Sequence, residues 1–525
     1  MSQDRSADSL RKRARRFCPR VCHSVVSLLL LWPSVARSQP ASLRPPDSAA
    51  AAPSAFAAAV AGSQQESAAG SAPAGRPGGE DPSSPDLTLP AVSFGTEEGR
   101  ACEGCPVRRP LLAIAEVFGI NAVYNRAAAL THITDPRVYN ISLGSWKKNV
   151  TGPVIWDYDS FRVNVFGHAY QASTYFTAGR SLGMNYWESA LLSALGNASW
   201  EYLGETKTPS TNDLINSALG GPILGEVLYR LGWLLRDTKQ AGPMRLLREI
   251  GATGIDLSTG INRFAFREAT RVTEKPLELR PPTLRADVGV GIVWTGDDKQ
   301  VTAATGVLYL EFNLEYGRLD APHGNKPFNA FTLTLRTGGG APMSVSTMRG
   351  HLAARRLGRS SEPRHQLLVT QGFDYENNPA FQISGHSFAA GLADRFALSK
   401  RTELSTTALA GVIPIGASDL PASLHAERPY DFGTGAGFFG TATLRHGRVL
   451  IGRLSYSVFY LHTLSGTTSD HVVRVLHADG LVHLRKGLGF GVGADRVVKT
   501  IQLDGGAKHR WVVPRLRFYL AWFPR

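Results

Sequence analysis

The chain predicts a membrane β-barrel of about 10–12 antiparallel strands preceded by a small helical domain, so the fold is α+β overall. In the final segment, apolar side chains alternate with arginines and other residues: Leu516, Phe518, Leu520 and Trp522 against Arg515, Arg517, Tyr519 and Ala521. A period of two, with one face for lipid and one for water, is typical of a transmembrane strand. Comparable segments recur roughly every 15–25 residues from Ala286 onward, and turn signals separate them.

These segments define a predicted barrel domain at residues 284–525. The 54 glycines of the chain suit strand corners and crowded lumens. A soluble all-β sandwich is the alternative fold. Aromatic residues near several strand ends, together with a last strand at the C-terminus, favour the barrel.

The N-terminus predicts a secretory signal peptide at residues 1–36. Basic residues come first, an apolar stretch runs from Val25 to Trp32, and Ser34-Val35-Ala36 offers small residues for cleavage. The apolar stretch is too short to span a bilayer. A basic disordered tail is the alternative interpretation. Export of a barrel protein predicts a location in the outer membrane.

Residues 37–105 predict a disordered linker that is rich in Ala, Ser, Pro and Gly. Near its end, Cys102 and Cys105 form a Cys-Glu-Gly-Cys motif, for which we predict a local disulfide in an oxidising compartment. A redox pair is the alternative, although the motif lacks the strand–helix context of a thioredoxin-like unit. Pro106 stands where haem attachment needs His, and no second cysteine pair follows, so no metal or cofactor is predicted.

The net charge predicts an anionic partner. Removing the signal peptide takes away seven Lys/Arg and two Asp, which lowers the formal charge from +14 to +9. A positive exported protein favours the lipid bilayer and anionic groups such as lipopolysaccharide or phospholipid headgroups. Nucleic acid is not predicted, because the body of the chain lacks a dense basic block and export argues against it.

Residues 106–240 predict a helical domain, and residues 241–283 a charged connector with short strands. One helix, from Asn185 to about Leu203, carries two ridges spaced by four, one small and one polar: Ala190, Ala194 and Ala198, then Ser189, Ser193, Asn197, Glu201 and Glu205. Small residues recur at the same spacing in Ser217, Gly221 and Gly225. We therefore expect two closely packed helices, with Gly220-Gly221-Pro222 kinking or breaking the second.

The polar ridge predicts a site, since such groups on an apolar helix need water, partners or a ligand. The candidate catalytic residues are His168, Glu188, Glu201 and Arg180. Each has a structural alternative. Glu188 is spaced to cap the helix that begins after Asn185, and Arg180 to bind carbonyls at a helix end. Glu201 could pair with basic residues, and His168 could be a hydrogen-bonded structural residue.

Several spaced motifs carry a resemblance to a known family. They include Asn164-Val165-Phe166-Gly167-His168, Trp187-Glu188-Ser189, Trp200-Glu201-Tyr202, Asn212-Asp213 and Gly220-Gly221-Pro222-Ile223-Leu224-Gly225-Glu226. Over about residues 156–236 the chain resembles bacterial envelope proteins with the "domain of unknown function 3943". The resemblance implies a helical block joined to an outer-membrane barrel, and no reaction. Ala169 departs from the Pro expected there. We predict structural roles for Asn164, Trp187, Trp200, Asp213, Gly221, Gly225 and Glu226.

Three functions fit these observations, and the sequence leaves open whether the protein is an enzyme. The first is an outer-membrane barrel, a channel or a structural protein, with a helical periplasmic or plug domain. The second is an envelope lipid-modifying hydrolase or acyltransferase that uses His168 with Glu188 or Glu201. The third is a periplasmic binding or assembly partner.

Overall fold

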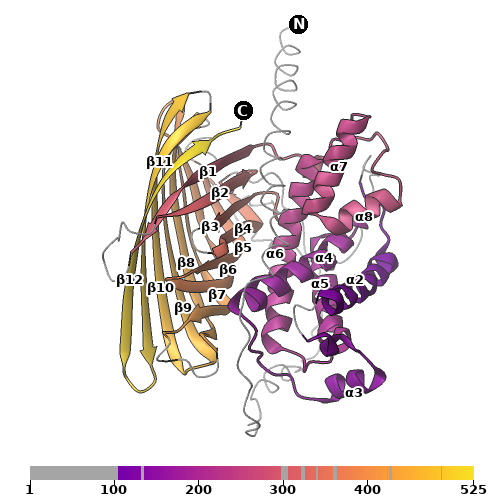
Figure 1. Cartoon of the computed structure of the whole chain (residues 1–525). Helices are drawn as coiled ribbons and strands as arrows, with labels where there is room; N and C mark the ends of the chain where they lie inside the picture. Colours follow the sequence, from indigo (N-terminus) through magenta and orange to yellow (C-terminus); the bar gives the residue numbers. More distant parts are fainter. Residues whose placement is uncertain are drawn as a thin grey trace, which may run out of the picture. The chain divides into compact units, whose positions relative to one another are not determined.

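The computed structural model of the chain describes residues 105–131, 135–296, 306–320, 326–338, 341–358, 364–421, 424, 428–447, 449–485 and 487–524. The predicted signal peptide at 1–36, and all but the last residue of the predicted linker at 37–105, lie outside these residues. Within them the chain forms a bundle of helices and then a run of antiparallel strands (Figure 1).

The described part of the helical region contains seven α-helices. They are α2 (Pro110–Thr131), α3 (Leu143–Thr151), α4 (His168–Ser181), α5 (Tyr186–Ser199), α6 (Thr211–Leu235), α7 (Pro243–Ile255) and α8 (Leu257–Ala265). Single π-helical turns, Val163–Gly167 and Trp200–Gly204, precede α4 and follow α5. Helix α4 is central, since it contacts α2, α5, α6 and α8. Among the described helices, none has the length and hydropathy to cross a membrane.

Gly221 lets α6 approach both α4 and α5. A Cβ at this position would lie 2.7 Å from the Cβ of Ala172 and 2.5 Å from the Oγ of Ser193. The predicted close packing of the two helices is therefore present, and it includes α4 as well. The predicted break at Gly220-Gly221-Pro222 is absent, because α6 continues through Pro222 to Leu235. Burial of this stretch against its neighbours overrides the local preference of proline.

The segment 241–283 differs from the connector with short strands that the sequence predicts. It contains α7, α8 and a short turn at Leu277–Leu279. Both helices have the 3.6-residue period, but their buried faces carry charged and polar residues such as Arg245, Glu249 and Arg263. A helix with its polar face inward is hard to recognise from a pattern that assumes an apolar inner face.

Twelve described strands form one closed antiparallel barrel, in which each strand pairs with its sequence neighbours and β1 also pairs with β12. They are β1 (Leu284–Thr295), β2 (Val307–Tyr316), β3 (Phe331–Gly338), β4 (Ala341–Leu357), β5 (Arg364–Asn378), β6 (Phe381–Ala397), β7 (Thr402–Asp419), β8 (Tyr430–His446), β9 (Val449–Ser465), β10 (Ser469–Arg485), β11 (Leu488–Leu503) and β12 (Lys508–Trp522). This confirms the predicted fold class and its strand number.

The two faces of the strands differ as the sequence predicts. On β12, Arg515 and Arg517 point inward, where they form ion pairs, whereas Phe518 and Leu520 are exposed on the outside. On β5, Asp374 and Glu376 line an internal cavity. The barrel therefore has a charged interior and an apolar exterior.

The helical bundle packs on the outer face of the barrel. On β5 it contacts the residues that alternate with the inward carboxylates: Phe161 stacks on Tyr375 with ring centroids 5.5 Å apart, and the ring of Phe166 lies 6.1 Å from Phe373. The Tyr186 hydroxyl donates to Gln371 Oε1 at 2.7 Å. The plug alternative is thus wrong, because the described residues that line the cavity come only from the strands and the β2–β3 connection.

Candidate functional site

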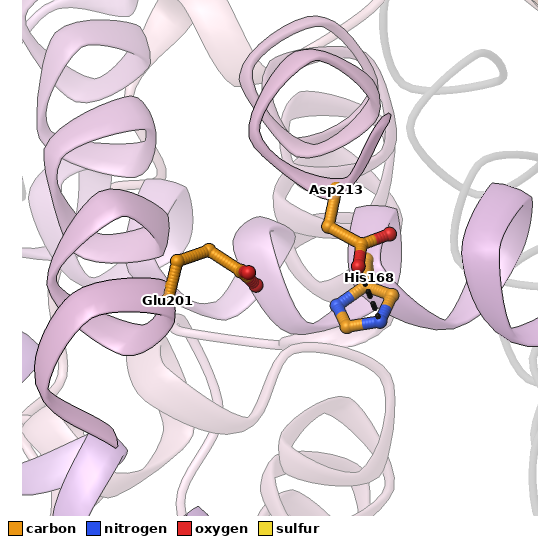
Figure 2. A group of neighbouring side chains, drawn as sticks. All are labelled: His168, Glu201 and Asp213. Carbon is orange, nitrogen blue, oxygen red and sulfur yellow. Dashed lines mark ion pairs between the residues drawn. The ribbon is translucent and has the colours of Figure 1, made fainter. Parts of the chain in front are cut away.

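Three titratable side chains converge where α4, the π-turn after α5 and the start of α6 meet. His168 is the first residue of α4, Glu201 lies in the π-turn, and Asp213 lies in the first turn of α6. One ligand atom from each lies within 4.8 Å of the others, and His168 Nε2 is 3.5 Å from Asp213 Oδ2. Figure 2 shows Glu201 extending toward the other two from the opposite side. π-turns are frequent at functional sites.

The local sequence fixes two of these side chains. The Ser210 hydroxyl accepts a hydrogen bond from the backbone N–H of Asp213 and so caps α6. The backbone N–H of Ser210 in turn donates to Glu201 Oε2 at 2.9 Å. Asn212 donates to Asp213 Oδ1 at 2.9 Å. The start of α6 therefore holds both carboxylates in place.

Two buried atoms of this group have no hydrogen-bond partner among the described residues: Glu201 Oε1 and His168 Nδ1. Glu201 is 1% exposed. Burial raises the pKa of Glu201 to about 8, and the nearby Asp213 carboxylate raises it further while His168 lowers it. A buried carboxylate, a second carboxylate and an imidazole at this spacing can share a proton or bind a cation.

Glu188 and Arg180, the other predicted catalytic residues, are engaged elsewhere. Glu188 completes a capping box with Asn185 and accepts both guanidinium bonds of Arg108 at 2.7 Å. Arg180 binds Glu226 at 2.8 Å and the Met184 carbonyl at 2.9 Å. Glu188 therefore caps a helix and Arg180 binds a carbonyl near a helix end, as their structural alternatives predict. The hydrolase that pairs His168 with Glu188 gains no support.

The residues predicted as structural make packing or hydrogen-bond contacts, and one of them, Asp213, also lies beside His168. Asn164 donates to the Tyr430 hydroxyl at 2.8 Å, and Trp200 packs on Tyr139 with ring centroids 6.5 Å apart. Glu226 is fully buried between Arg180 and Arg230, each 2.8 Å away. Trp187 packs against Tyr186, and Gly225 faces Phe176 of α4.

The exception is Asp213, for which the sequence predicts a structural role and which the structure places beside His168 as well as at the capped start of α6. A carboxylate can be held at a helix start and still present an oxygen to a neighbour, so the spacing from Ser210 did not exclude a site. At the predicted disulfide, Cys105 is disulfide-bonded, and Cys102 lies outside the described residues.

Inside the barrel, the cavity has a volume of about 280 Å³. Charged side chains of opposite sign cross it. Arg515 of β12 binds Glu376 of β5 at 2.5 Å, and Arg285 of β1 binds Glu403 of β7 at 2.7 Å. The lumen charges are therefore paired across the barrel, unlike the carboxylates at His168.

A family model matches part of the helical region. The family described as "Domain of unknown function (DUF3943)" matches residues 153–257, which contain α4 to α7 and the three converging side chains. No curated protein sequence matches the chain.

Among solved structures, the chain is similar to three outer-membrane barrels. The outer membrane channel DcaP of Acinetobacter baumannii is 9% identical, with a TM-score of 0.19 over 46% of this chain and 96% of that one. The toluene transporter TodX of Pseudomonas putida is 8% identical, with a TM-score of 0.18 over 47% and 91%. A loop-deletion mutant of OmpT of Vibrio cholerae is 7% identical, with a TM-score of 0.19 over 46% and 99%. Likeness this slight carries no inference about function.

Proposed function

We propose that the protein is a structural barrel of the outer membrane, with a closed lumen, that holds its helical bundle in the bilayer against the barrel wall. The observation that carries this proposal is the apolar cluster and the ion pairs that occupy the barrel interior beside the cavity of about 280 Å³. A channel needs a continuous wet path, whereas a scaffold needs a rigid wall.

An apolar cluster fills one part of the lumen. It draws on every strand from β5 to β12, with members Leu368, Phe381, Ile383, Ala389, Ala393, Leu409, Ile413, Phe439, Phe459, Leu461, Val473, Val475, Val497 and Val513. Phe439 and Phe459 meet edge to face with ring centroids 5.6 Å apart. Contact among side chains from so many strands leaves little room for water along the axis.

Ion pairs cross the remainder of the lumen. Arg515 of β12 binds Glu376 of β5 at 2.5 Å, and Arg445 of β8 reaches Glu315 of β2 at 3.1 Å. Paired charges that join distant strands brace the barrel wall. They support a structural role over free passage of a solute.

The exposed band of the barrel supports a lipid environment. Large apolar side chains are exposed on β8 to β12 and on β1: Phe438, Leu454, Leu476, Val482, Phe490, Phe518, Leu520, Val290 and Ile292. Such a band on a closed barrel is typical of outer-membrane proteins. The predicted signal peptide and the positive net charge fit export to a surface rich in anionic lipid.

The helical bundle has the same inverted polarity as the barrel. On α2, the most buried positions are Ala113, Val117, Asn121 and Asn125, while the exposed ones include Leu111, Ile114, Phe118, Val123 and Leu130. On α7 and α8, Arg245, Glu249, Asn262 and Arg263 are buried, while Met244, Leu247, Ile250, Ile261 and Phe264 are exposed. Helices that face water have the opposite arrangement, so lipid is the solvent that fits this surface.

Helix α6 runs from one rim of the barrel to the other. Near its start, Asp157 accepts a bond from Arg428, which precedes β8, and near its end Arg230 binds Asn329, which precedes β3. Successive hairpins alternate between the two rims, so the β7–β8 and β2–β3 connections lie at opposite rims. The 25 residues of α6 extend about 37 Å along the barrel wall.

Conductance in planar bilayers tests the closed lumen. We expect no stepwise currents from the purified protein, and ion leakage when the inward Phe439→Ala shortens the apolar cluster. The adjacent Phe438 points outward, so Phe438→Ala is the matched control and stays silent. Stepwise currents from the wild-type protein contradict the scaffold and support a channel.

Spin labels test the position of the bundle. A label at Leu195→Cys on α5 should be accessible to oxygen and shielded from a water-soluble nickel reagent, as should one at Leu520→Cys on β12. Lys147→Cys, on α3, is exposed and adjoins the exposed Lys148, so its label should meet the nickel reagent. If the Leu195 and Lys147 labels behave alike, the bundle lies in water.

A further inference from the structure

The geometry points to a divalent transition-metal site formed by His168, Glu201 and Asp213 inside the helical bundle. It adds a ligand to the proposed scaffold and does not depend on the lumen being closed. The three ligand atoms lie within 4.8 Å of one another, and they come from three separate elements of the bundle. Such convergence is what a polydentate site requires.

A second observation is that one buried carboxylate oxygen of Glu201 has no hydrogen-bond partner among the described residues. Its Oε2 accepts one backbone bond, whereas its Oε1 has no partner among the described residues although the side chain is 1% exposed. Figure 2 shows this carboxylate directed at His168 and Asp213. A buried carboxylate oxygen without a partner is costly, and a metal ion is one group that could bind it.

Charge favours a cation at the same place. No arginine or lysine in the described ranges forms an ion pair with Glu201 or Asp213. Further acidic groups, Asp157, Asp159 and Glu205, add to the negative potential at Asp213. Among these acidic groups, Asp159 pairs with Lys207 at 3.2 Å. A divalent ion would compensate the two buried carboxylates directly.

The ligand types select the class of metal. One imidazole nitrogen with two carboxylate oxygens suits Zn²⁺ or Mn²⁺ better than Ca²⁺ or Mg²⁺, which prefer oxygen alone. Two ligands at about 2.1 Å from a metal lie at most about 4.2 Å apart, so binding draws the group together slightly. Three protein ligands leave one position open for water or another ligand, as in catalytic zinc sites. The unpartnered His168 Nδ1 is left for an orienting contact.

The test is Zn²⁺ binding to the full chain in detergent after removal of metals with a chelator. Equilibrium dialysis with metal analysis should give one tight Zn²⁺ per chain, and Co²⁺ in its place should give visible absorption bands. Glu201→Gln and Asp213→Asn should weaken binding by at least about 100-fold, since loss of even an outer partner of a metal ligand costs 10–100-fold. Glu205→Gln removes an acid that adds to the negative potential but is not one of the three ligands, so this matched control should weaken binding far less than Glu201→Gln.

Each outcome is informative because folding is measured in the same samples by circular dichroism. Equal affinity of the wild type and Glu201→Gln overturns the site, since the ion then binds elsewhere, for example at lumen histidines. Absence of tight Zn²⁺ and Mn²⁺ binding to the folded wild type overturns it as well. Neither result bears on the scaffold, which conductance tests independently.

Discussion

The barrel and the helical bundle both bury charged side chains and expose large apolar ones, but they compensate the buried charge differently. In the barrel, Asp374 faces Arg349 at 2.9 Å and Glu376 faces Arg515 at 2.5 Å. In the bundle, Glu226 is compensated in the same way, whereas within the described residues His168 forms the one ion pair of Asp213 and Glu201 forms none. Compensated charges are sufficient to explain a stable wall. The two carboxylates without a basic partner, Glu201 and Asp213, are therefore the groups of the bundle that remain available to bind a cation.

Removing the best-compensated charge of the bundle should have the largest effect on stability. Glu226 is fully buried and binds both Arg180 and Arg230. Glu226→Ala leaves two buried guanidinium groups without their carboxylate, which typically costs about 3–5 kcal/mol. Urea unfolding in lipid vesicles, followed by tryptophan fluorescence, measures the change.

The matched control keeps the shape of the side chain. Glu226→Gln retains one oxygen acceptor for an arginine while removing the charge, so we expect it to be destabilised by less than Glu226→Ala. Equal unfolding midpoints for Glu226→Ala and the wild type contradict a bundle held by this ion-pair group.

The two regions also differ in how much of each could be predicted from the sequence. A strand has a period of two, and the arginines of β12 stand out against Phe518 and Leu520 whichever solvent lies outside. The closed barrel was therefore predictable. On α7 and α8 the period is present, but polar residues occupy the inner face, so a rule that expects apolar residues inside favoured a connector.

The site was predicted only in part, for a related reason. His168 and Glu201 stand on polar positions that attract attention in an apolar helix. Asp213 and Glu188 have the same first-turn spacing from a capping residue, so the sequence cannot separate the one that meets a histidine from the one that meets Arg108. Contacts between residues far apart in the chain decide that, and local spacing contains no information on them.

Charged residues on the two exteriors test whether both face lipid. Leu195 on α5 and Leu520 on β12 are 59% and 57% exposed. Leu→Lys at either position should cost about 2–4 kcal/mol near the middle of a bilayer and less toward its edges. Leu277 is also exposed but adjoins Glu278 and follows a charged stretch, so Leu277→Lys should be close to neutral. The free energy of unfolding of each variant is measured in lipid vesicles. If Leu520→Lys is destabilised and Leu195→Lys is not, the barrel faces lipid and the bundle does not.

Close helix packing in the bundle should respond to a single methyl group. Gly221→Ala would place a Cβ against Ala172 and Ser193, and such overpacking costs about 1–3 kcal/mol. Gly254 of α7 has no atom within 4 Å of the position of a Cβ. Gly254→Ala should therefore stabilise α7 by up to about 1 kcal/mol through helix propensity. Urea unfolding should show a lower free energy of unfolding for Gly221→Ala and a higher one for Gly254→Ala. If Gly254→Ala is destabilised as much as Gly221→Ala, the cost is not specific to the close packing at Gly221.

The smallest effect is expected for a charge pair in the lumen. Arg285 binds Glu403 at 2.7 Å, and Arg318 also binds Glu403 at 3.1 Å, and the three side chains are 10–19% exposed. Because a second arginine remains when Arg285→Met removes the first, Glu403 stays compensated. A double-mutant cycle of Arg285→Met and Glu403→Gln should give a coupling of at most about 1 kcal/mol, as for solvated pairs. A coupling free energy as large as the loss of stability in Glu226→Ala would mean that the lumen excludes water as well as the bundle does. The difference in charge compensation between the two regions would then not explain why the proposed metal site lies in the bundle.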